Sequence, residues 1–229
     1  MHKRPSLKWS TIGEAWRWRG PFVFFLVGLR EIVRPVAYWH VFHIFEIDLT
    51  REPVPQPHAG EPIEVKIYAG AADLEKAKTE IVSMGRLAPE VVHSRFNRGD
   101  TAAIAYVGQQ PAGYAWMSFT SGSVELAFGV NWIVGPDESV RYDYFVLPKW
   151  RGRRVFSCLN SAVVACARNL GIVRTFSSIS TVNTQSMSLA KRDGRIPVMK
   201  VTLAHVRGLN RTFHRTAGAP FEFRFLKPG

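Results

Sequence analysis

The stretch that decides the fold is Tyr142-Asp-Tyr-Phe-Val-Leu-Pro-Lys-Trp-Arg-Gly-Arg-Arg-Val-Phe-Ser-Cys-Leu-Asn160. An apolar run ends at Pro148, four cations fall within the next six residues, and an amphipathic pattern begins directly behind them. This order predicts a strand, a basic turn and the start of a helix. Such an arrangement can hold a diphosphate, because N–H groups at a helix N-terminus point at a bound anion. A solvated basic loop between two core elements is the alternative that these residues leave open.

The helix behind the turn is predicted by its apolar stripe. The stripe has the 3.6-residue period of one helix face and consists of Val155, Leu159, Ala162, Val163, Cys166 and Leu170. Burial of this face would fix the turn against a sheet. Cys158 and Cys166 lie about 12 Å apart at about 1.5 Å rise per residue, which is too far for a disulfide. We therefore expect buried, unpaired thiols and a reducing compartment.

The composition implies an anionic partner. The chain has 229 residues, a net charge of +12 and a pI near 10.2. A phosphorylated cofactor, an acidic membrane surface and nucleic acid all fit this charge. The cations are spread along the chain without a nucleic-acid motif, so no specific nucleic acid is expected. No zinc spacing is present, and His40 and His43 lack a third ligand, so no metal is expected.

The first 50 residues read as a basic, aromatic arm. Residues 10–34 predict an amphipathic helix that can lie on a membrane surface, with aromatic side chains at headgroup depth. Packing of its aromatic side on the domain, or on a second subunit in a homodimer, is the alternative. Residues 20–29 are too short to span a bilayer, and no cleavage site follows. We therefore expect a cytoplasmic protein, with the inner membrane surface as a further option.

The remainder divides into a linker and one domain. Residues 51–62 contain four prolines and form the predicted linker, and residues 63–229 form the domain. Extended segments are expected at 37–49, 63–68, 101–107, 112–119, 124–134, 139–147, 172–180, 197–206 and 220–226. Helices are expected at 72–84, 155–170 and 183–192, and a short helix or turn at 89–96. Helices interspersed with hairpins indicate an α/β (α+β) fold with a mixed, largely antiparallel central sheet flanked by helices.

Three local patterns resemble the GNAT superfamily of acyl-CoA-dependent N-acyltransferases. Residues 146–159 resemble the strand, turn and helix that bind the diphosphate of coenzyme A in that family. Asn183-Thr-Gln-Ser186, leading to Gly194, is similar to the family's "N-x-x-S/A … Gly" helix. Residues 107–116 look like its central hairpin. The order and spacing of the three agree, and the resemblance extends from residue 63 to residue 206.

This resemblance implies a GNAT-like fold and the transfer of an acetyl group from acetyl-CoA, or of another acyl group from its CoA thioester, to an amine. The amine attacks the thioester directly in a ternary complex, and a strand N–H near Phe145 and Val146 polarises the carbonyl. The acceptor is expected to be a small-molecule or cell-envelope amine. The residues expected to hold the coenzyme are Phe145, Val146, Arg151, Gly152, Arg153, Arg154, Val155, Phe156 and Asn183.

The catalytic groups have several candidates. Asp143, between two tyrosines, and Glu125 are candidate bases. A water relay, or catalysis without a base, is the remaining option. Asp143 can instead form an ion pair with Arg141 or another nearby cation. Ser186 can donate a proton to the leaving thiolate or be an ordinary exposed helical serine. Asn183 can cap its helix, contact the pantetheine arm, or do both.

Two departures from the family pattern leave a second function open. Arg154 and Phe156 stand where the family's turn has small residues, which let the backbone approach a phosphate. Arg154 can instead contribute a charge-assisted contact to phosphate. Ala190 stands where many members carry a tyrosine that protonates the thiolate. The alternative is a catalytically degenerate GNAT-like module that binds CoA or regulates a partner.

Overall fold

The computed structural model describes residues 37–50, 62–119, 123–127, 130–192, 195, 197–206, 211–218 and 225–226. The chain forms two compact units, one of residues 45–178 and 221–229 and the other of residues 1–44 and 179–220. Strands β1 (Ala37–Asp48) and β8 (Arg174–Ser180) each run from one unit into the other. The predicted helix at 10–34 and all but the last residue of the predicted linker lie outside the described residues. The division into arm, linker and domain therefore stays a prediction.

The first unit is built on a mixed sheet. Its strands are β2 (Ile63–Tyr68), β3 (Thr101–Val107), β4 (Gln110–Phe119), β7 (Glu138–Val146) and β8, in the order β2-β3-β4-β7-β8. Neighbours from β2 to β7 pair antiparallel, and β7 pairs with β8 in parallel. The parallel pair is joined by a crossover through a helix, as parallel strands require. The predicted mixed, largely antiparallel sheet is confirmed.

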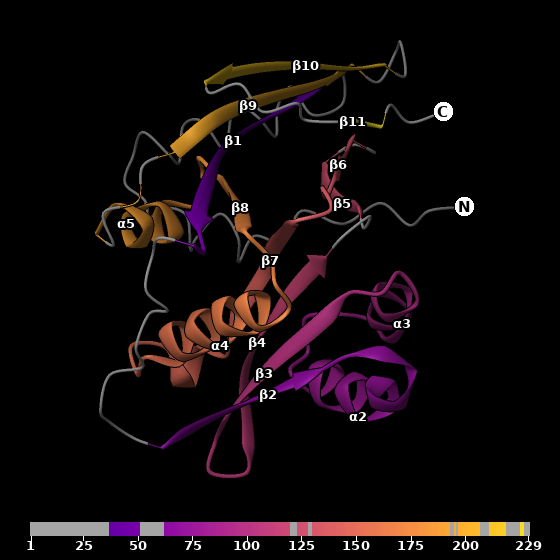
Figure 1. The fold of residues 1–229 in the computed structure, drawn as a ribbon, viewed down its shortest axis with the longest axis vertical. Coiled ribbons are helices and arrows are strands. Elements are labelled where there is room, and N and C mark those ends of the chain that lie inside the picture. Colours follow the sequence, from indigo (N-terminus) through magenta and orange to yellow (C-terminus); the bar gives the residue numbers. More distant parts are fainter. Residues whose placement is uncertain are drawn as a thin grey trace. The chain divides into compact units, whose positions relative to one another are not determined.

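Helices cover both faces of this sheet (Figure 1). Helices α2 (Gly70–Ser83) and α3 (Pro89–Asn97) pack on one face, and α4 (Val155–Asn169) packs on the other. The core under α2 and α3 includes Ala77, Ile81, Val92, Phe96, Ile104, Tyr114 and Trp116. The core under α4 includes Ala103, Ala105, Ala112, Ala115, Met117, Val155, Leu159 and Val163. The alanines on this second face let α4 lie close to the strands.

The predicted stripe of α4 is buried at three positions, half-buried at Ala162 and Cys166, and exposed at its end. Val155, Leu159 and Val163 are at most 1% exposed. Leu170 is 61% exposed, because the helix ends at Asn169 and Leu170 follows as its C-cap. None of the helices in the described ranges is long and apolar enough to cross a membrane.

A small sheet completes the first unit. It contains β5 (Ser123–Ala127), β6 (Val130–Ile133) and β11 (Phe225–Leu226), in the order β11-β6-β5. The extended segment expected at 124–134 is thus an antiparallel pair of strands rather than one strand. The strand expected at 220–226 is confined to two residues among those described.

The second unit contains α5 (Thr184–Arg192), β9 (Pro197–Val206) and β10 (Arg211–Gly218). Strands β9 and β10 pair antiparallel, with Arg211 opposite Val206. Strand β9 has the bounds that the sequence predicts. Strand β10 is not predicted, because its polar and basic residues give too weak an alternation to identify a strand without its partner.

Candidate active site

Strand β7 carries a β-bulge at the predicted site. The register between β4 and β7 slips beside Ala115, so that two residues of β7, Asp143 and Tyr144, lie opposite this one residue. Asp143 has φ 47°, in the left-handed region. An extra residue in one strand reverses the alternation of the side chains that follow it. Tyr142 and Phe145 therefore both face α2 and α3, whereas Tyr144 faces α4.

One edge of β7 is open beyond the bulge. In the described part of the chain, pairing of β7 with β8 ends at Arg141 and Ser177, while β7 remains paired with β4 as far as Val146. The Leu147 N–H donates to the carbonyl oxygen of Ala112 at 2.9 Å, which is the side of β4. Neighbouring residues of a strand point their N–H groups to opposite sides, so the N–H and carbonyl of Val146 lie on the open edge.

The basic turn follows this edge. A short 3₁₀ helix, η1 (Pro148–Trp150), leads to exposed Gly152 and Arg154, which have φ 77° and 66°. Both conformations are left-handed and favour glycine. The chain thus keeps, with an arginine at residue 154, a backbone conformation that glycine adopts with less strain.

The N-terminus of α4 adjoins this turn. The Cys158 N–H donates to the carbonyl oxygen of Arg154 at 3.0 Å, which closes the first turn of the helix. The N–H groups of residues 155–157 have no intrahelical partner, and no side chain of the described residues caps them. Uncapped N–H groups beside four exposed cations form a site at which an anion is stabilised.

Several contacts hold the turn in place. The Lys149 ammonium donates to Oε1 of Gln110 at 3.1 Å, and the Arg151 guanidinium donates through Nε to the carbonyl oxygen of Val146 at 3.2 Å. Lys149 and Arg153 both lie over the ring of Trp150, at 5.3 and 5.2 Å from its centroid. Trp150 in turn packs on the core under α4. The position of the turn is therefore tied to the open edge and to the core.

Phe156 points toward the strand. Its ring centroid lies 5.2 Å from that of Tyr144, and the Tyr144 hydroxyl lies 3.5 Å from Oδ1 of Asn160. The same Asn160 oxygen accepts a hydrogen bond from buried Arg141 at 2.6 Å. Phe156 thus occupies space between the first turn of α4 and β7 rather than pointing away from it.

Asp143 is held by two arginines. Its Oδ2 accepts a hydrogen bond from Nη1 of Arg95 at 2.7 Å, and its Oδ1 lies 3.5 Å from Nη2 of Arg86. An ion pair of Asp143 is one of the two arrangements that the sequence allows, although its partners are Arg95 and Arg86 and not Arg141. The role of Asp143 as a base stays a prediction. Sequence patterns do not indicate either partner, because Arg95 is 48 residues away along the chain.

A hydrogen-bonded network adjoins this cluster. The Tyr142 hydroxyl donates to Oδ2 of Asp100 at 2.5 Å, and Arg98 pairs with the same carboxylate oxygen. Burial raises the pKa of Tyr142, and the negative charge of Asp100 adds to this. Burial also raises the pKa of Tyr114, and the charge of Asp143 adds to it. Both phenols therefore stay protonated at neutral pH and cannot accept a proton from an amine there.

The other predicted site residues belong to other elements of the chain. Glu125 is an exposed residue of β5, opposite Asn131 in the small sheet. Asn183 caps α5 in the second unit, where its Oδ1 accepts the Ser186 N–H at 3.2 Å. The helix-capping role of Asn183 is confirmed, whereas its contact with pantetheine and the catalytic roles of Ser186 and Glu125 stay predictions.

Both cysteines are free thiols on α4, as the spacing predicts. Burial raises the pKa of Cys158 and of Cys166, so neither has the thiolate character that a nucleophile needs. No group of three or more metal-ligating side chains occurs within the described ranges.

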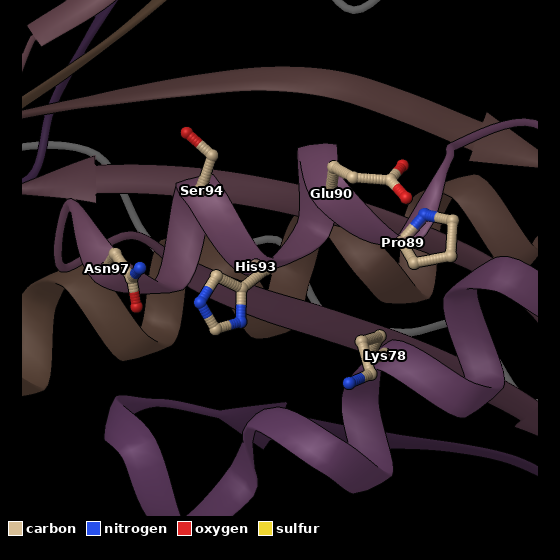
Figure 2. A pocket seen from close by; sticks show the side chains of 6 residues that line it. All are labelled: Lys78, Pro89, Glu90, His93, Ser94 and Asn97. Carbon is tan, nitrogen blue, oxygen red and sulfur yellow. The ribbon is translucent and has the colours of Figure 1, made fainter.

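A pocket of about 400 Å³ lies between α2 and α3. Figure 2 shows Lys78 of α2 and His93 of α3 on facing sides of this space. The remaining lining residues are Pro89, Glu90, Ser94 and Asn97. Val92 and Phe96 of α3 are buried against the sheet, so the pocket lies on a different side of this helix from the sheet and Asp143. We therefore assign the candidate active site to β7 and the basic turn.

Solved structures align with this chain at low sequence identity. A conserved protein of unknown function from Staphylococcus epidermidis aligns with a TM-score of 0.52 at 12% identity, over 78% of this chain and 65% of its own. A putative GNAT-family acetyltransferase from Novosphingobium aromaticivorans gives 0.48 at 16% identity, over 74% and 66%. An aminoglycoside N-acetyltransferase solved with CoA gives 0.41 at 20% identity, over 56% and 88%. No protein-family model matches the sequence, and no curated protein matches it either.

The arrangement of the elements agrees with the GNAT-like fold that the sequence resemblance implies. A helix pair lies between the first two strands of the domain, three antiparallel strands follow, and a helix crosses over to a parallel strand, in the order that the sequence resemblance implies. This chain spans about two thirds of the length of the first two solved structures, 65% and 66%. At these identities the likeness establishes the fold alone, and the function is argued from the site.

Proposed function

We propose that the protein is an acyl-CoA-dependent N-acyltransferase whose coenzyme diphosphate binds at the basic turn. One observation carries this proposal: the edge of β7 at Val146, which no described strand covers, runs directly through the basic turn into the N-terminus of α4, which no described side chain caps. A donor for a thioester oxygen and a site for a diphosphate then lie on one continuous segment. The acyl group is proposed to be acetyl, with other acyl-CoA thioesters as the alternative.

The reaction proposed is direct transfer. The N–H of Val146 donates to the thioester oxygen and stabilises the negative charge that develops as the amine attacks the carbonyl carbon. The amine must be neutral to attack. Asp143, Glu125 and a water relay remain the proposed routes for its proton, and Ser186 remains the proposed donor to the thiolate.

Most of the proposed contacts with the coenzyme are made by residues of the basic turn. Arg151, Arg153 and Arg154 are proposed to neutralise the phosphates, and the N–H groups of Val155 and Phe156 to donate to them. Gly152 has no atom of the described residues, its chain neighbours aside, within 4 Å of an added Cβ, which leaves room for the ligand on the outside of the turn. Phe145 and Val146 are proposed to line the thioester, and Asn183 to contact pantetheine.

Calorimetric titration with CoA tests this proposal. We expect binding in the micromolar range by the wild type, and at least about tenfold weaker binding by the variant Arg151→Ala plus Arg153→Ala, because two charge-assisted contacts are lost. Lys66→Ala plus Lys76→Ala removes the same charge from β2 and α2 and is the matched control. Pantetheine, which lacks the diphosphate, should bind both double variants equally. Wild type that does not bind CoA, or a turn variant that binds as tightly as the control, would refute the proposal.

A CoA-binding module without catalysis is the second candidate. It is favoured by the ion pairs of Asp143, by Phe156 against the strand, and by buried Ala190 at the family's tyrosine position. Release of the CoA thiol from acetyl-CoA with a broad panel of amines distinguishes the two. CoA binding without amine-dependent release supports the module, and transfer to any amine rejects it.

The surroundings of the enzyme are proposed from the sequence alone. We infer a small-molecule or cell-envelope amine as acceptor and a cytoplasmic location, with residues 10–34 on the membrane surface or in a homodimer contact. Cosedimentation with anionic and neutral lipid vesicles tests the first contact, and analytical ultracentrifugation tests the second. Salt-sensitive binding to anionic vesicles alone is the result expected for a basic helix at a membrane.

A further inference from the structure

A cationic cluster lies on the α2 and α3 side of the bulge. It consists of Arg86, Arg95 and Asp143, so two guanidinium groups face one carboxylate and leave a net charge of +1. The neighbouring pair of Arg98 and Asp100 adds no net charge. The bulge turns Asp143 toward these helices, whereas the basic turn lies at the start of α4 on the other face. A thioester at the edge of β7 therefore has the coenzyme's phosphates on one side and this cluster on the other.

Arg86 is the accessible member of the cluster. Its side chain is 50% exposed, whereas those of Arg95 and Asp143 are 16% and 15% exposed. Its nitrogen lies 3.5 Å from the Asp143 carboxylate, compared with 2.7 Å for Arg95. Its guanidinium carbon lies over the ring of Phe145, 5.1 Å from the ring centroid. Arg86 therefore has guanidinium N–H groups that face solvent. Their planar arrangement matches the two oxygens of a carboxylate.

A second observation points to a polar ligand here. The Tyr114 side chain is fully buried, and its hydroxyl has no hydrogen-bond partner within the described residues. Its ring packs 5.5 Å from that of Phe145, and the charges of Asp143, Arg86 and Arg95 all act on its hydroxyl. Buried hydroxyl groups are rarely left without a partner in a finished core, and a bound polar group can satisfy this one.

We propose that this cluster selects amines that carry a carboxylate, as amino acids do, as the acceptors of the transfer reaction. The inference rests on the proposed function and names its substrate class. Arg86 binds the acceptor's carboxylate through two parallel hydrogen bonds. The net positive charge repels polyamines and other acceptors with several cations, because like charges brought together oppose binding.

The reaction at the bound acceptor is direct transfer. The acceptor must be in its neutral amine form to attack the acyl carbon. The amine nitrogen then bonds to the acyl carbon, the carbon–sulfur bond breaks, and the proton lost by nitrogen ends on the sulfur. The products are an N-acyl amino acid and the CoA thiol. This route does not need Asp143 to leave its arginine partners.

Matched acceptors test the inference by binding. L-phenylalanine and phenethylamine differ only in the carboxylate, as do L-lysine and cadaverine, and ligand-observed NMR can measure their affinities for the full chain with and without CoA. We expect each amino acid to bind at least about tenfold more tightly than its decarboxylated partner, from the strength of a charge-assisted pair. In Arg86→Gln this ratio should fall close to one, and in Arg86→Lys it should be partly kept. Lys66→Gln, an exposed cation of β2, is the control and should keep the wild-type ratio.

The outcome separates this inference from the proposed function. CoA titration decides the coenzyme site, while the amine titrations report on the cluster whether or not CoA binds. Three results would each overturn the selectivity. The first is that phenethylamine and cadaverine bind as tightly as the amino acids or more tightly, and the second is that no amino acid binds at millimolar concentration. The third is that the affinity ratio of amino acid to amine is unchanged in Arg86→Gln. If transfer is detected, Arg86→Gln should raise KM for the amino acids with little change in kcat, and leave KM for phenethylamine unchanged.

Discussion

Replacing Arg154 by glycine should stabilise the protein. Arg154 has φ 66° and ψ 4°, a left-handed conformation that costs a residue with a Cβ roughly 1–2 kcal/mol. The substitution also removes a cation from the N-terminus of α4, where it opposes the helix dipole by about 0.3–1 kcal/mol. Against this, glycine raises the entropy of the unfolded chain, which costs about 0.4–1 kcal/mol. The net expectation is a gain of about 1 kcal/mol, or about 2–4 °C in Tm for a chain of this size.

Arg153→Gly is the matched control for this prediction. It removes the same charge and adds the same flexibility one residue earlier, but Arg153 is not among the residues with positive φ. It also loses the contact of its guanidinium with the ring of Trp150. We expect Arg153→Gly to be about 0.5–1 kcal/mol less stable than wild type, mainly from the flexibility that glycine adds. Chemical denaturation with urea at neutral pH measures the free energy of unfolding of both variants.

The same pair of variants should not differ in coenzyme binding. Each loses one exposed cation from the turn, and glycine at residue 154 keeps the backbone conformation that presents the N–H groups of α4. Both are therefore expected to bind CoA several-fold more weakly, to a similar extent. If Arg154→Gly is no more stable than Arg153→Gly, the strain assigned to the turn is wrong. If Arg154→Gly instead binds CoA more tightly than wild type, the guanidinium obstructs the phosphates and does not bind them.

Three further changes probe the strands around the site. Gly113→Ala would place a Cβ 2.5 Å from the carbonyl oxygen of Phe145, and we expect it to cost about 1–3 kcal/mol of stability and to lower kcat more than CoA affinity. Gly135→Ala, whose Cβ would lie 2.8 Å from a side-chain oxygen of Glu138 and not from a backbone atom, is the control and should cost less. Burial raises the pKa of Tyr114 in the folded chain, so the unfolded chain loses this proton first as the pH passes about 10, and stability falls above that pH by up to about 1.4 kcal/mol per unit. Tyr114→Phe should therefore lessen the loss of urea stability between about pH 9 and pH 11, and an unchanged pH dependence would contradict the raised pKa. Asp143→Asn leaves two arginines without their counter-charge and should cost about 1–3 kcal/mol in the same assay; a variant as stable as wild type would show that the ion pairs contribute nothing.

Local periodicity accounts for most of the elements that the sequence predicts correctly. Strands β2, β3 and β9 have the predicted bounds, and α4 begins at the predicted Val155. Each of these segments carries its own signal, either a run of β-branched and apolar residues or a stripe at helical spacing. The capping of α5 by Asn183 can likewise be predicted from the sequence, because an N-cap side chain bonds only to the next three residues.

Features that depend on a partner strand cannot be predicted from the local sequence. The apolar residues of 142–147 look the same with or without a bulge, and it is the pairing with β4 that inserts Asp143 as an extra residue. The bulge then decides which of Tyr144 and Phe145 meets α4 and which meets α2 and α3. Strand β10 is missed for the same reason, since its partner β9 stabilises it more than its own residues do.

The candidate site likewise has features that the sequence determines and features that only the tertiary structure decides. The sequence by itself determines the GNAT-like order of elements and the run of strand, basic turn and helix, because these rest on neighbouring residues. Only the tertiary structure decides that Arg154 is left-handed, that Phe156 lies against Tyr144, and that Arg86 and Arg95 hold Asp143. These contacts join residues that are distant along the chain or depend on backbone angles imposed by packing. A charge on a distant helix leaves no trace in the residues around the aspartate that it binds.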